Sequence, residues 1–540
     1  MNKKHLLTTA VSIVAAAAIL VGCSMPGSSE TSGTDPQPLP AVLDPIDDNY
    51  RTFYQIFVGS FSDSNGDGVG DLRGIIERFD YLNDGNINSG KSLGVQGIWL
   101  SPIFSSPSYH KYDATDYYKV SARFGTMDDL KELIALCKSR NVKLILDLAI
   151  NHTSTSHDWF QKFVDARTNG ISDDPYFDYY TCVLEEEKQA GITYQRVGNT
   201  PYWYECNFSG DMPELNFDNE TVRQEVLDIA KFYLELGIDG FRFDAVKYIY
   251  YGDTARSVDF WEWYMAELKK IKPDIYCVGE CWSGETEILE YYSAMNCFNF
   301  AMSQAEGVVA SAAKGLSFTR YINYIESYQD RVLERNPEAM VMPFLSNHDM
   351  DRIAGVFILD SNMRMAANLY LLCTGSPVIY YGEEIGMRGS RGGANTDANR
   401  RLAMLWGDGD TIRNPEGSSY PSKNQIQTTV ADQIADENSL YNYYCRLIAI
   451  RHRYPAIARG DYKAVICGTG KIGGFRITYE GETLGLFHNV TAETVSYDLS
   501  KCKELEGFTF TTLCDYIGSG AATLEGTILT IDPQTSVILR

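Results

Sequence analysis

Two charged side chains interrupt an otherwise apolar segment, GFRFDAVKY at residues 240–248. The pattern predicts a buried strand over 238–246, where uncompensated charges are costly. Because side chains two residues apart point to the same face of a strand, Arg242 and Asp244 should lie side by side. A guanidinium favours the ionised carboxylate, and an ionised, partly buried Asp can act as a nucleophile at a sugar carbon. Taken alone, the pair is also compatible with a structural ion pair.

The elements that must position these residues are short apolar runs that alternate with amphipathic ones. Eight runs are predicted as strands, at 53–58, 95–103, 142–150, 238–246, 274–281, 298–302, 341–346 and 377–381. Helical periodicity lies between most of them, for example at 127–139, 220–236 and 259–271. The alternation predicts an α/β fold of parallel strands with helical crossovers, and eight strands favour a closed (β/α)8 TIM barrel. A doubly wound parallel sheet is the alternative.

Polar residues follow several of these runs at the same relative position. They are Asp147, Asn151 and His152 after the third run, Arg242 and Asp244 in the fourth, Glu280 in the fifth, and Asn347, His348 and Asp349 after the seventh. In a TIM barrel the active site forms at the carboxyl ends of the strands. Four such groups on one rim predict an active site there, although each group alone has a structural explanation.

The rest of the chain is predicted to form segments and domains outside the barrel. The segment between the third and fourth strands is long, aromatic and Gly-rich, which predicts an inserted subdomain near the active face. After a helix at 439–453, short strands and turns from about residue 461 predict an antiparallel β-sandwich. The expected organisation is a signal peptide at 1–22, a flexible tether at 23–46, a barrel of 47–150 and 213–458, an inserted domain at 151–212 and a C-terminal sandwich at 459–540.

The N-terminal segment has the features of an export signal. Lys3 and Lys4 precede an apolar run at 6–22 that is too short for a comfortable membrane span. The run closes with Leu-Val-Gly-Cys at 20–23, which resembles a bacterial lipobox. This resemblance implies cleavage before Cys23 and lipidation of its sulfur, so that acyl chains anchor an exported protein to the cell surface. An ordinary cleaved signal is the alternative. The Ser-, Gly- and Pro-rich segment that follows predicts a flexible stalk.

The composition narrows the class of ligand. The chain of 540 residues carries a net charge of -24, which argues against nucleic acid as a partner and fits a neutral substrate. Its 36 Tyr and 7 Trp could stack against sugar rings, although surplus aromatic residues more often fill a core. Most of the 12 Cys are predicted to be reduced core residues, with pairing undecided, and no metal-binding Cys spacing is present.

Four short segments together resemble the signatures of the α-amylase family, glycoside hydrolase family thirteen. They are DLAINH at 147–152, GFRFDAVKY at 240–248, GECW at 279–282 and FLSNHD at 344–349. A fifth, MPELN at 212–216, resembles the MPDLN of members that lie between the oligo-1,6-glucosidase and neopullulanase groups, with Glu214 in place of Asp. The motifs keep the family's order, and the resemblance extends from about Asn49 to the C-terminus.

The resemblance implies a retaining glycoside hydrolase with two principal carboxyl groups roughly 5–5.5 Å apart. Asp244 would be the nucleophile, and Glu280 the acid and then the base, with its pKa raised by the apolar neighbours Val278 and Trp282. Asp349 would form hydrogen bonds with sugar hydroxyls and help to distort the sugar ring. The implied substrate-binding residues are Tyr109, His110, Tyr112, His152, Arg242, Lys247, His348 and Arg352.

Residues near these motifs narrow the range of expected substrates. The segment Tyr-His-Lys-Tyr at 109–112 matches the Tyr-His-Gly-Tyr of many α-amylases, apart from Lys111. Exo-acting α-glucosidases of the family usually carry Asp where Tyr109 stands, so an open cleft is expected. Ala245 and Lys247 resemble α-1,4-specific members, in which the lysine lies on the leaving-group side, whereas Tyr248 replaces their His. The expected activity is α-1,4 hydrolysis of starch and maltooligosaccharides by a monomer.

Two alternatives remain open. The first is a neopullulanase or α-glucosidase with some α-1,6 activity. The second, from a different class of protein, is a catalytically inactive starch-binding lipoprotein. Inactive relatives lose carboxylates, and because this chain keeps all three, the enzyme is favoured.

The loop at 63–71, DSNGDGVGD, is predicted to bind a metal. It places oxygen-bearing side chains at nearly every other position, with glycines that permit a tight wrap around a hard cation. It resembles the start of an EF-hand but has Gly74 at the twelfth position, where the bidentate Glu should be. The family resemblance implies Ca²⁺ held by Asp63, Asn65, Asp67, the Val69 carbonyl and Asp71. A metal-free turn is the alternative.

Overall fold

The computed structural model describes residues 46–540, except residues 88 and 408. The predicted signal peptide, the lipidation site at Cys23 and nearly all of the tether lie outside the described residues. Within the part that is described, no helix combines the length and hydropathy needed to span a bilayer.

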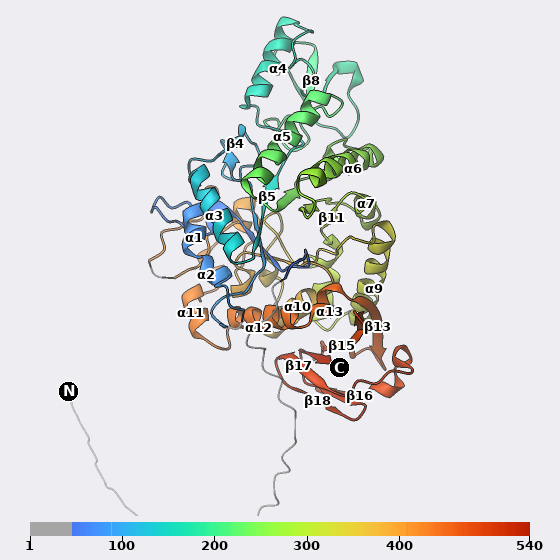
Figure 1. The fold of residues 1–540 in the computed structure, drawn as a ribbon. Helices are drawn as coiled ribbons and strands as arrows, with labels where there is room; N and C mark the ends of the chain where they lie inside the picture. Colours follow the sequence, from blue (N-terminus) through green and yellow to red (C-terminus); the bar gives the residue numbers. More distant parts are fainter. Residues whose placement is uncertain (1–45, 88, 408) are drawn as a thin grey trace, which may run out of the picture. The chain divides into compact units, whose positions relative to one another are not determined.

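A curled parallel sheet forms the centre of the fold (Figure 1). Its strands are β1 (Phe53–Ile56), β2 (Gly97–Leu100), β5 (Lys143–Leu148), β9 (Gly240–Phe243), β10 (Tyr276–Gly279), β11 (Asn296–Cys297) and β12 (Val378–Tyr380), in the order β11-β10-β9-β5-β2-β1-β12. Parallel bridges join Phe298 to Met342 and Phe344 to Val378, so the 342–344 segment occupies the place between β11 and β12. The structure is therefore the expected TIM barrel, and not a doubly wound sheet.

Two of the eight predicted strands differ in detail. The sixth strand is β11 at 296–297, and much of the predicted run at 298–302 is instead the 3-10 helix η4 (Phe300–Met302). The seventh is reduced to the isolated bridges at Met342 and Phe344. Both runs are apolar because Phe298, Met342 and Phe344 pack in the barrel interior with Trp99. Burial makes a run apolar whether or not it is a strand, so periodicity could not separate the two cases.

Helices cover the outside of the sheet (Figure 1). They are α1 (Leu72–Glu77), α2 (Phe79–Leu82), α3 (Met127–Ser139), α5 (Glu220–Leu236), α6 (Thr254–Ile271), α7 (Glu285–Tyr291), α8 (Val308–Ala313), α9 (Phe318–Arg335), α10 (Asp360–Leu371), α11 (Val430–Ala435), α12 (Leu440–Arg453) and α13 (Pro455–Arg459). The helices predicted at 127–139 and 220–236 are confirmed. Thr126 and Asp129 form a capping box at the start of α3, and Gly237, with φ 108°, ends α5 in the left-handed region.

The long segment after β5 folds above the carboxyl ends of the barrel strands (Figure 1). It contains α4 (Asp158–Asn169) and the antiparallel strands β6 (Cys182–Leu184), β7 (Tyr194–Arg196) and β8 (Tyr202–Glu205), in the order β6-β8-β7. A small hairpin of β3 (Phe104–Ser105) and β4 (Asp116–Val120) follows β2. Both irregular segments leave the same end of the barrel and so bring loop residues to one rim.

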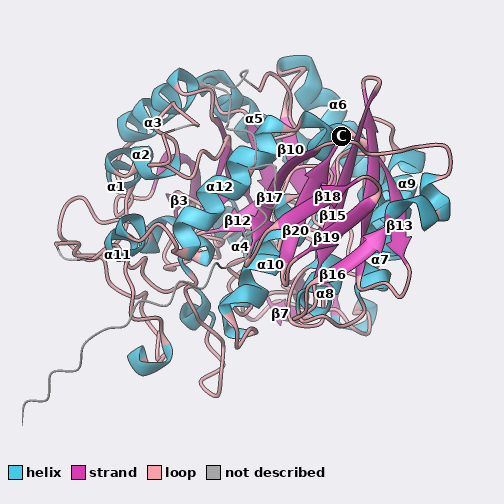
Figure 2. Ribbon diagram, turned by 90° about the horizontal axis from the view of Figure 1, so that it is seen from below, coloured by secondary structure: helices cyan, strands magenta, loops and turns pink. Residues whose placement is uncertain are grey.

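The C-terminal residues form two antiparallel sheets (Figure 2). One contains β13 (Asp461–Cys467), β14 (Ile472–Tyr479), β15 (Glu482–Asn489), β20 (Thr535–Leu539) and β17 (Leu513–Gly518); the other contains β16 (Val495–Asp498), β19 (Ile528–Ile531) and β18 (Ala522–Glu525). The larger sheet packs on the barrel helices, where Asn368 of α10 donates from its side-chain nitrogen to the carbonyl of Ile517 at 3.1 Å. The two parts share one hydrophobic core.

Candidate active site

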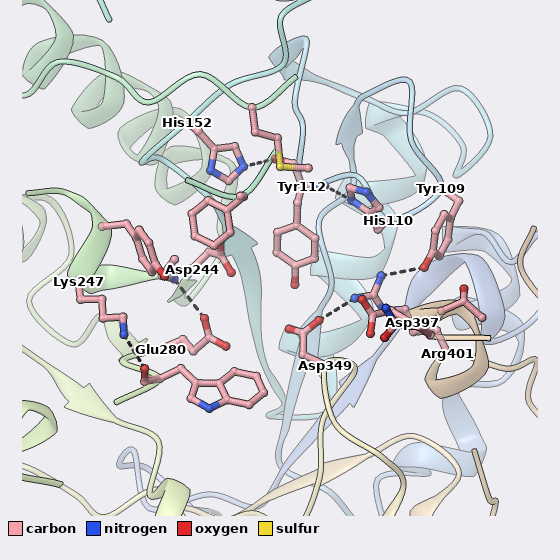
Figure 3. Close-up of a pocket in the computed structure, with 17 residues that line it drawn as sticks. Tyr109, His110, Tyr112, His152, Asp244, Lys247, Glu280, Asp349, Asp397 and Arg401 are labelled. Carbon is pink, nitrogen blue, oxygen red and sulfur yellow. Dashed lines mark hydrogen bonds and ion pairs between the residues drawn. The ribbon is translucent and has the colours of Figure 1, made fainter. Parts of the chain in front are cut away.

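A cavity of about 760 Å³ opens at the carboxyl ends of the barrel strands (Figure 3). It is lined by the three predicted carboxylates and by most of the predicted substrate-binding residues. The lining residues are Tyr109, His110, Tyr112, His152, Phe208, Met212, Asp244, Ala245, Lys247, Tyr248, Glu280, Trp282, Asp349, Asn395, Thr396, Asp397 and Arg401.

Arg242 links the carboxylates from beneath the cavity. Its guanidinium is fully buried, and Nη1 donates to Asp147 Oδ1 at 2.7 Å and to Asp244 Oδ1 at 2.6 Å. Nη2 lies 3.2 Å from Glu280 Oε1. Burial opposes the positive charge, but the surrounding carboxylates outweigh it and raise the pKa of Arg242 well above its usual value. A permanent cation thus lies in direct contact with the carboxyl group of Asp244.

Asp147 lies deeper and has a supporting role. It is fully buried, and Oδ2 accepts hydrogen bonds from Trp99 Nε1 at 3.1 Å and from the Tyr112 hydroxyl at 2.9 Å. Burial raises the pKa of Asp147 to about 6, against the lowering effect of Arg242. It does not line the cavity and instead fixes Arg242 and Tyr112.

Glu280 follows β10 and faces Asp244 across a sharp backbone turn. Ala245 adopts φ 47° and ψ 48°, a conformation that is uncommon for a residue with a side chain. This turn directs the Ala245 N–H toward Glu280 Oε2 at 3.3 Å and the Val246 N–H to the Glu280 carbonyl at 3.0 Å. Burial, followed by the charges of Asp244 and Asp349, raises the pKa of Glu280 to about 8 against the opposing charge of Arg242. Glu280 is therefore protonated at neutral pH.

The cause of the raised pKa of Glu280 differs in part from the predicted cause. Val278 is buried in the barrel interior, but Trp282 is 43% exposed and lines the cavity mouth. The neighbouring carboxylates thus contribute where the sequence suggested only apolar contact.

Asp349 lies on the opposite wall and is held by an arginine that the sequence did not reveal. Arg401 Nη2 donates to Asp349 Oδ1 at 2.7 Å, and its Nη1 donates to the Tyr109 hydroxyl at 3.0 Å (Figure 3). Burial would raise the pKa of Asp349, but the contacts with His348 and Arg401 outweigh it and hold the pKa well below its usual range. Asp349 is therefore a stable anion near the protonated Glu280.

His348 lies beneath the cavity and does not line it. Its side chain is completely buried, with Gln55 Nε2 2.7 Å from Nδ1 and Asp349 Oδ2 3.0 Å from Nε2. The ring also stacks on Tyr112, with centroids 5.4 Å apart and an angle of 3° between the planes. In this structure His348 orients Tyr112 and Asp349, and the sugar contact implied by the family resemblance stays a prediction.

His152 and His110 line the cavity at its other side. His152 Nε2 donates to the Tyr112 carbonyl at 3.2 Å, so this nitrogen already has a protein partner. Burial lowers the pKa of His152, and burial together with Arg401 lowers the pKa of His110 to about 4. Both rings are neutral at physiological pH, which suits hydrogen bonding to an uncharged ligand.

Lys247 and Tyr248 lie beside Glu280. Lys247 Nζ donates to the Trp282 carbonyl at 2.8 Å, and Tyr248 packs against Phe208, with ring centroids 4.5 Å apart. Lys111, the departure from the family pattern, points away from the cavity and donates from Nζ to the carbonyl of Ser106 at 3.1 Å. The substitution at 111 therefore leaves the cavity lining unchanged.

Arg352, which was expected to bind substrate, does not line the cavity. Its side chain is buried outside the cavity, where Nε donates to the Arg400 carbonyl at 3.1 Å and Nη1 to the Tyr381 carbonyl at 2.6 Å. The guanidinium also packs on the rings of Tyr380 and Tyr381. The family resemblance implied the role, but the chain turns Arg352 into the core.

The sequence missed several lining residues on two loops. They are Phe208 of the inserted segment, and Asn395, Thr396, Asp397 and Arg401 after β12. The long Gly-, Asn- and Arg-rich loop after the eighth strand was a usable signal, because loops at this end of a TIM barrel carry function. No individual residue of this loop stood out in the sequence as a candidate.

The loop at 63–71 fits calcium by the chemistry of its donors, which are all oxygen atoms. Gly66 and Gly68 have φ of 82° and 91°, and these angles permit the tight wrap. Asp63 Oδ1 accepts from the Gly66 N–H at 2.8 Å, and Asp71 Oδ2 accepts from the Ser64 N–H at 3.1 Å. Across residues 46–87, 89–407 and 409–540, no three Asp, Glu, His or Cys side chains converge as ligands. Calcium binding therefore stays a prediction.

Comparisons with known proteins agree with this geometry. The family model for the catalytic domain of α-amylase matches residues 55–460. Alpha-amylase 3 of Dictyoglomus thermophilum is 38% identical over 81% of this chain and 84% of its own length, and an oligo-1,6-glucosidase of Bacillus cereus is 30% identical over 83% and 91%. The structure of Eubacterium rectale Amy13B superposes with a TM-score of 0.84 at 34% identity, covering 92% of this chain and 97% of that one. With a model match over most of its length, the chain belongs to the α-amylase family and is a glycoside hydrolase.

Proposed function

We propose that the protein is a retaining α-amylase that hydrolyses α-1,4 bonds in starch and maltooligosaccharides. The single observation that carries the proposal is the arrangement of Asp244 and Glu280 in one cavity against the shared cation of Arg242. The guanidinium of Arg242 lies 2.6 Å from Asp244, whereas burial and neighbouring charges raise the pKa of Glu280 to about 8. One carboxylate and one carboxylic acid are what a double-displacement mechanism requires.

In the first step, an Asp244 oxygen attacks the anomeric carbon while Glu280 transfers its proton to the departing glycosidic oxygen. The bond to the leaving sugar breaks, and a covalent glycosyl-enzyme forms. In the second step Glu280, now ionised, removes a proton from water, which attacks the same carbon and releases Asp244. Two inversions leave the anomeric configuration unchanged.

The other cavity residues support substrate positioning. Asp349 is fixed by Arg401 and His348 and can accept hydrogen bonds from sugar hydroxyls, which favours a distorted ring. Tyr112 presents an aromatic surface held by His348. The Tyr109 hydroxyl accepts a hydrogen bond from Arg401. Exo-acting relatives usually carry Asp at this position, so the tyrosine supports cleavage within a glucan chain.

A second candidate is α-1,6 cleavage, of the neopullulanase or oligosaccharide-glucosidase type. It is favoured by Tyr248, which departs from the α-1,4-specific pattern and lines the cavity beside Glu280. The similarity to oligo-1,6-glucosidases, proteins that are named for that linkage, points the same way. Lys247, which lines the cavity near the acid, supports the α-1,4 assignment.

Product analysis on maltotriose, amylopectin and pullulan separates these candidates. An α-1,4 hydrolase releases short maltooligosaccharides from amylopectin, and proton NMR at early time should show the α-anomer first. Maltotriose released from pullulan requires cleavage of α-1,6 bonds and would support the second candidate. Early β-anomer would contradict retention, and starch binding without turnover would identify the inactive lipoprotein.

We further propose that the enzyme is exported and held at the cell surface by a lipid on Cys23, on the basis of the sequence at 20–23. Wild-type protein should partition with the membrane fraction in a bacterial host, and Cys23→Ser should release it. Equal partitioning of both would contradict the anchor.

A further inference from the structure

The C-terminal sheets enclose a small second core that contains two cysteines in contact. Cys467 is the last residue of β13, and Cys502 lies between the short 3-10 helices η9 (Leu499–Lys501) and η10 (Lys503–Leu505). Their Sγ atoms are 3.2 Å apart and share a hydrogen bond, although the two residues are 35 positions apart in the chain. Both side chains are almost fully buried, with 2% and 4% exposure.

Strand alternation directs Cys467 into this small core. Val465 and Cys467, two residues apart on β13, belong to it, whereas Ala464 and Ile466 pack on the larger core that is shared with the barrel. Cys467 therefore lies on the side of the larger sheet that faces away from the barrel, where η10 packs against β13. Neither Cys467 nor Cys502 lines the catalytic cavity.

The segment that carries Cys502, residues 499–512 between β16 and β17, is held mainly by packing. At its start the Leu499 N–H donates to the Thr527 carbonyl at 2.8 Å. The next backbone hydrogen bonds are local, such as those from the Cys502 N–H to the Leu499 carbonyl and from the Leu505 N–H to the Cys502 carbonyl. Leu499, Cys502 and Leu505 insert their side chains into the small core. A covalent bond to β13 would anchor this segment.

The chemistry of the pair favours one cysteine as the nucleophile. With Cys467 as the donor, the shared hydrogen bond lowers the pKa of Cys502 and, together with burial, raises the pKa of Cys467. Because a thiolate is the nucleophile in thiol–disulfide exchange, Cys502 is the better attacking group. A disulfide bond is about 2.05 Å long, so the two sulfur atoms need to approach by only roughly 1.2 Å.

We propose that Cys467 and Cys502 form a disulfide when the chain folds in an oxidising compartment. The inference rests on the proposed export for the compartment, because disulfides persist where the surroundings are oxidising. It rests on the contact between the two sulfur atoms for the pairing. The bond makes the outer layer of the C-terminal sheets the part of the molecule that responds to reduction.

The other cysteines provide a contrast. Among the eleven cysteines of the described residues, Cys467 and Cys502 are the one pair whose sulfur atoms share a hydrogen bond. Cys514 of β17 is also buried, but its Sγ lies 3.9 Å from the Thr512 carbonyl. Oxidation is therefore expected at one defined pair, and Cys514 supplies a matched control in the same sheets.

The reaction is a thiol–disulfide exchange in two steps. The Cys502 thiolate attacks the disulfide of a thiol–disulfide oxidoreductase, breaks that S–S bond and forms a mixed disulfide. Cys467, after losing its proton, attacks the Cys502 sulfur and displaces the oxidoreductase. The pair loses two electrons and two protons, and the oxidoreductase leaves as a dithiol. Because both sulfur atoms are buried in the folded chain, the exchange takes place before the small core closes.

The bond would close a loop that contains β14, β15 and β16 and would fix residues 499–505 on β13. Closing a loop of this length restricts the unfolded chain, so reduction should lower the melting temperature of the full chain by about 3 °C. Lys501 and Lys503, which flank Cys502, are exposed. Trypsin should cut the native chain at these lysines several-fold faster after reduction, because cleavage requires local opening of the segment.

Non-reducing tryptic mapping of the full chain from a bacterial periplasm tests the pairing directly. Free thiols are alkylated in denaturant before digestion. Cleavage at the flanking lysines should leave residues 464–471 joined to residues 502–503, lighter by two hydrogens than the two peptides together. Complete alkylation of Cys467 and Cys502 in protein recovered from the periplasm would overturn the inference.

Refolding of the reduced full chain with oxidised glutathione separates the pairing from the proposed export. The same linked peptide is expected, and its absence would overturn the inference. A linked peptide after refolding, with no protein reaching the periplasm, would contradict the export alone. Turnover on maltohexaose should be equal for the oxidised and the reduced protein, so activity tests the proposed hydrolase apart from the pair.

Two variants test the effect of the bond on stability. Cys467→Ala/Cys502→Ala keeps the small core apolar, and its melting temperature should not change on reduction. The matched control Cys514→Ala should keep both the linked peptide and the drop in melting temperature. A drop of the same size in the double variant would show that the bond does not stabilise the sheets, and would overturn that part of the inference.

Discussion

At the scale of single residues, one buried arginine contacts both of the proposed catalytic carboxyl groups. Arg242 contacts Asp244 at 2.6 Å through one nitrogen and lies 3.2 Å from Glu280 through the other. Burial, followed by the nearby carboxylates of Asp244 and Asp349, raises the pKa of Glu280 and so favours its protonated form. The proposed acid and the proposed nucleophile thus differ in their surroundings, although both are ordinary carboxyl groups by sequence.

The first prediction concerns these two residues. Glu280→Gln and Asp244→Asn should each reduce kcat by at least about 10³-fold, because each removes a proton donor or a nucleophile without changing volume. The measurement is initial rate on maltohexaose, with melting temperature as a check on folding. The matched carboxyl control is Asp128→Asn on α3, where the side chain is 89% exposed, and this variant should keep the wild-type rate. Wild-type rates in either active-site variant would contradict the assignments.

The second prediction is the pH dependence of activity. Glu280 has a raised pKa of about 8, so it is protonated below that value and loses its proton above it. Since only the protonated form can act as acid, kcat/KM should fall as pH rises through about 8. A profile from pH 5 to 10 measures this fall, with buffers matched in ionic strength. If the residual kcat/KM of the Glu280→Gln protein falls in the same way at high pH, another group must be responsible for the fall.

At the scale of elements, the barrel strands place their side chains on one rim, but the loops complete the cavity. Asp244 and Glu280 follow β9 and β10 directly, and Ala245 turns the chain between them. Arg401 comes from the loop after β12, and Phe208 from the inserted segment. Specificity is therefore expected to depend on the loops, while the strands hold the reacting groups.

The third prediction concerns the loop at 63–71. If the loop holds calcium through Asp63, Asn65, Asp67, the Val69 carbonyl and Asp71, a chelator should lower the melting temperature, because a ligand that binds only the folded state stabilises it. Asp67→Asn should weaken this response. The exposed Asp128→Asn control on α3 should retain it. Identical melting curves with excess chelator and with excess calcium would contradict the site.

At the scale of the whole molecule, the C-terminal sheets are not independent of the barrel. Apolar residues of β13, β14, β15 and β20 belong to the same core as the barrel helices, among them Tyr462, Phe475, Ile477 and Leu486. Arg453 of α12 also pairs with Asp515 of β17 at 2.8 Å. The contact is buried, so the two parts should unfold together.

The fourth prediction follows from that shared core. Removing residues 461–540 should expose apolar surface on the barrel and lower both soluble yield and melting temperature. The full chain should unfold in one calorimetric transition. A chain that begins at residue 46 is the control and should keep the transition of the full chain. Two well-separated transitions in the full chain would contradict the shared core.

The sequence alone determined the barrel, and it identified the three carboxyl groups that the structure brings into one cavity. Strand and helix periodicity are local properties, and the polar residues at strand ends interrupt them visibly, so the rim could be predicted before any contact was known. The predicted helices at 127–139 and 220–236 followed from the same local patterns. Only the tertiary structure decided which residues from distant loops complete the cavity.

The different positions of Arg352 and Arg401 have the same physical origin. The family resemblance implied a substrate contact for Arg352, but the backbone turns its side chain into the core, while Arg401 approaches Asp349 from a separate loop. Sequence separation carries little information about which loops meet. The local pattern specifies the elements and their polar ends. The approach of separate loops, and the burial that raises the pKa of Glu280, exist only once the chain is folded.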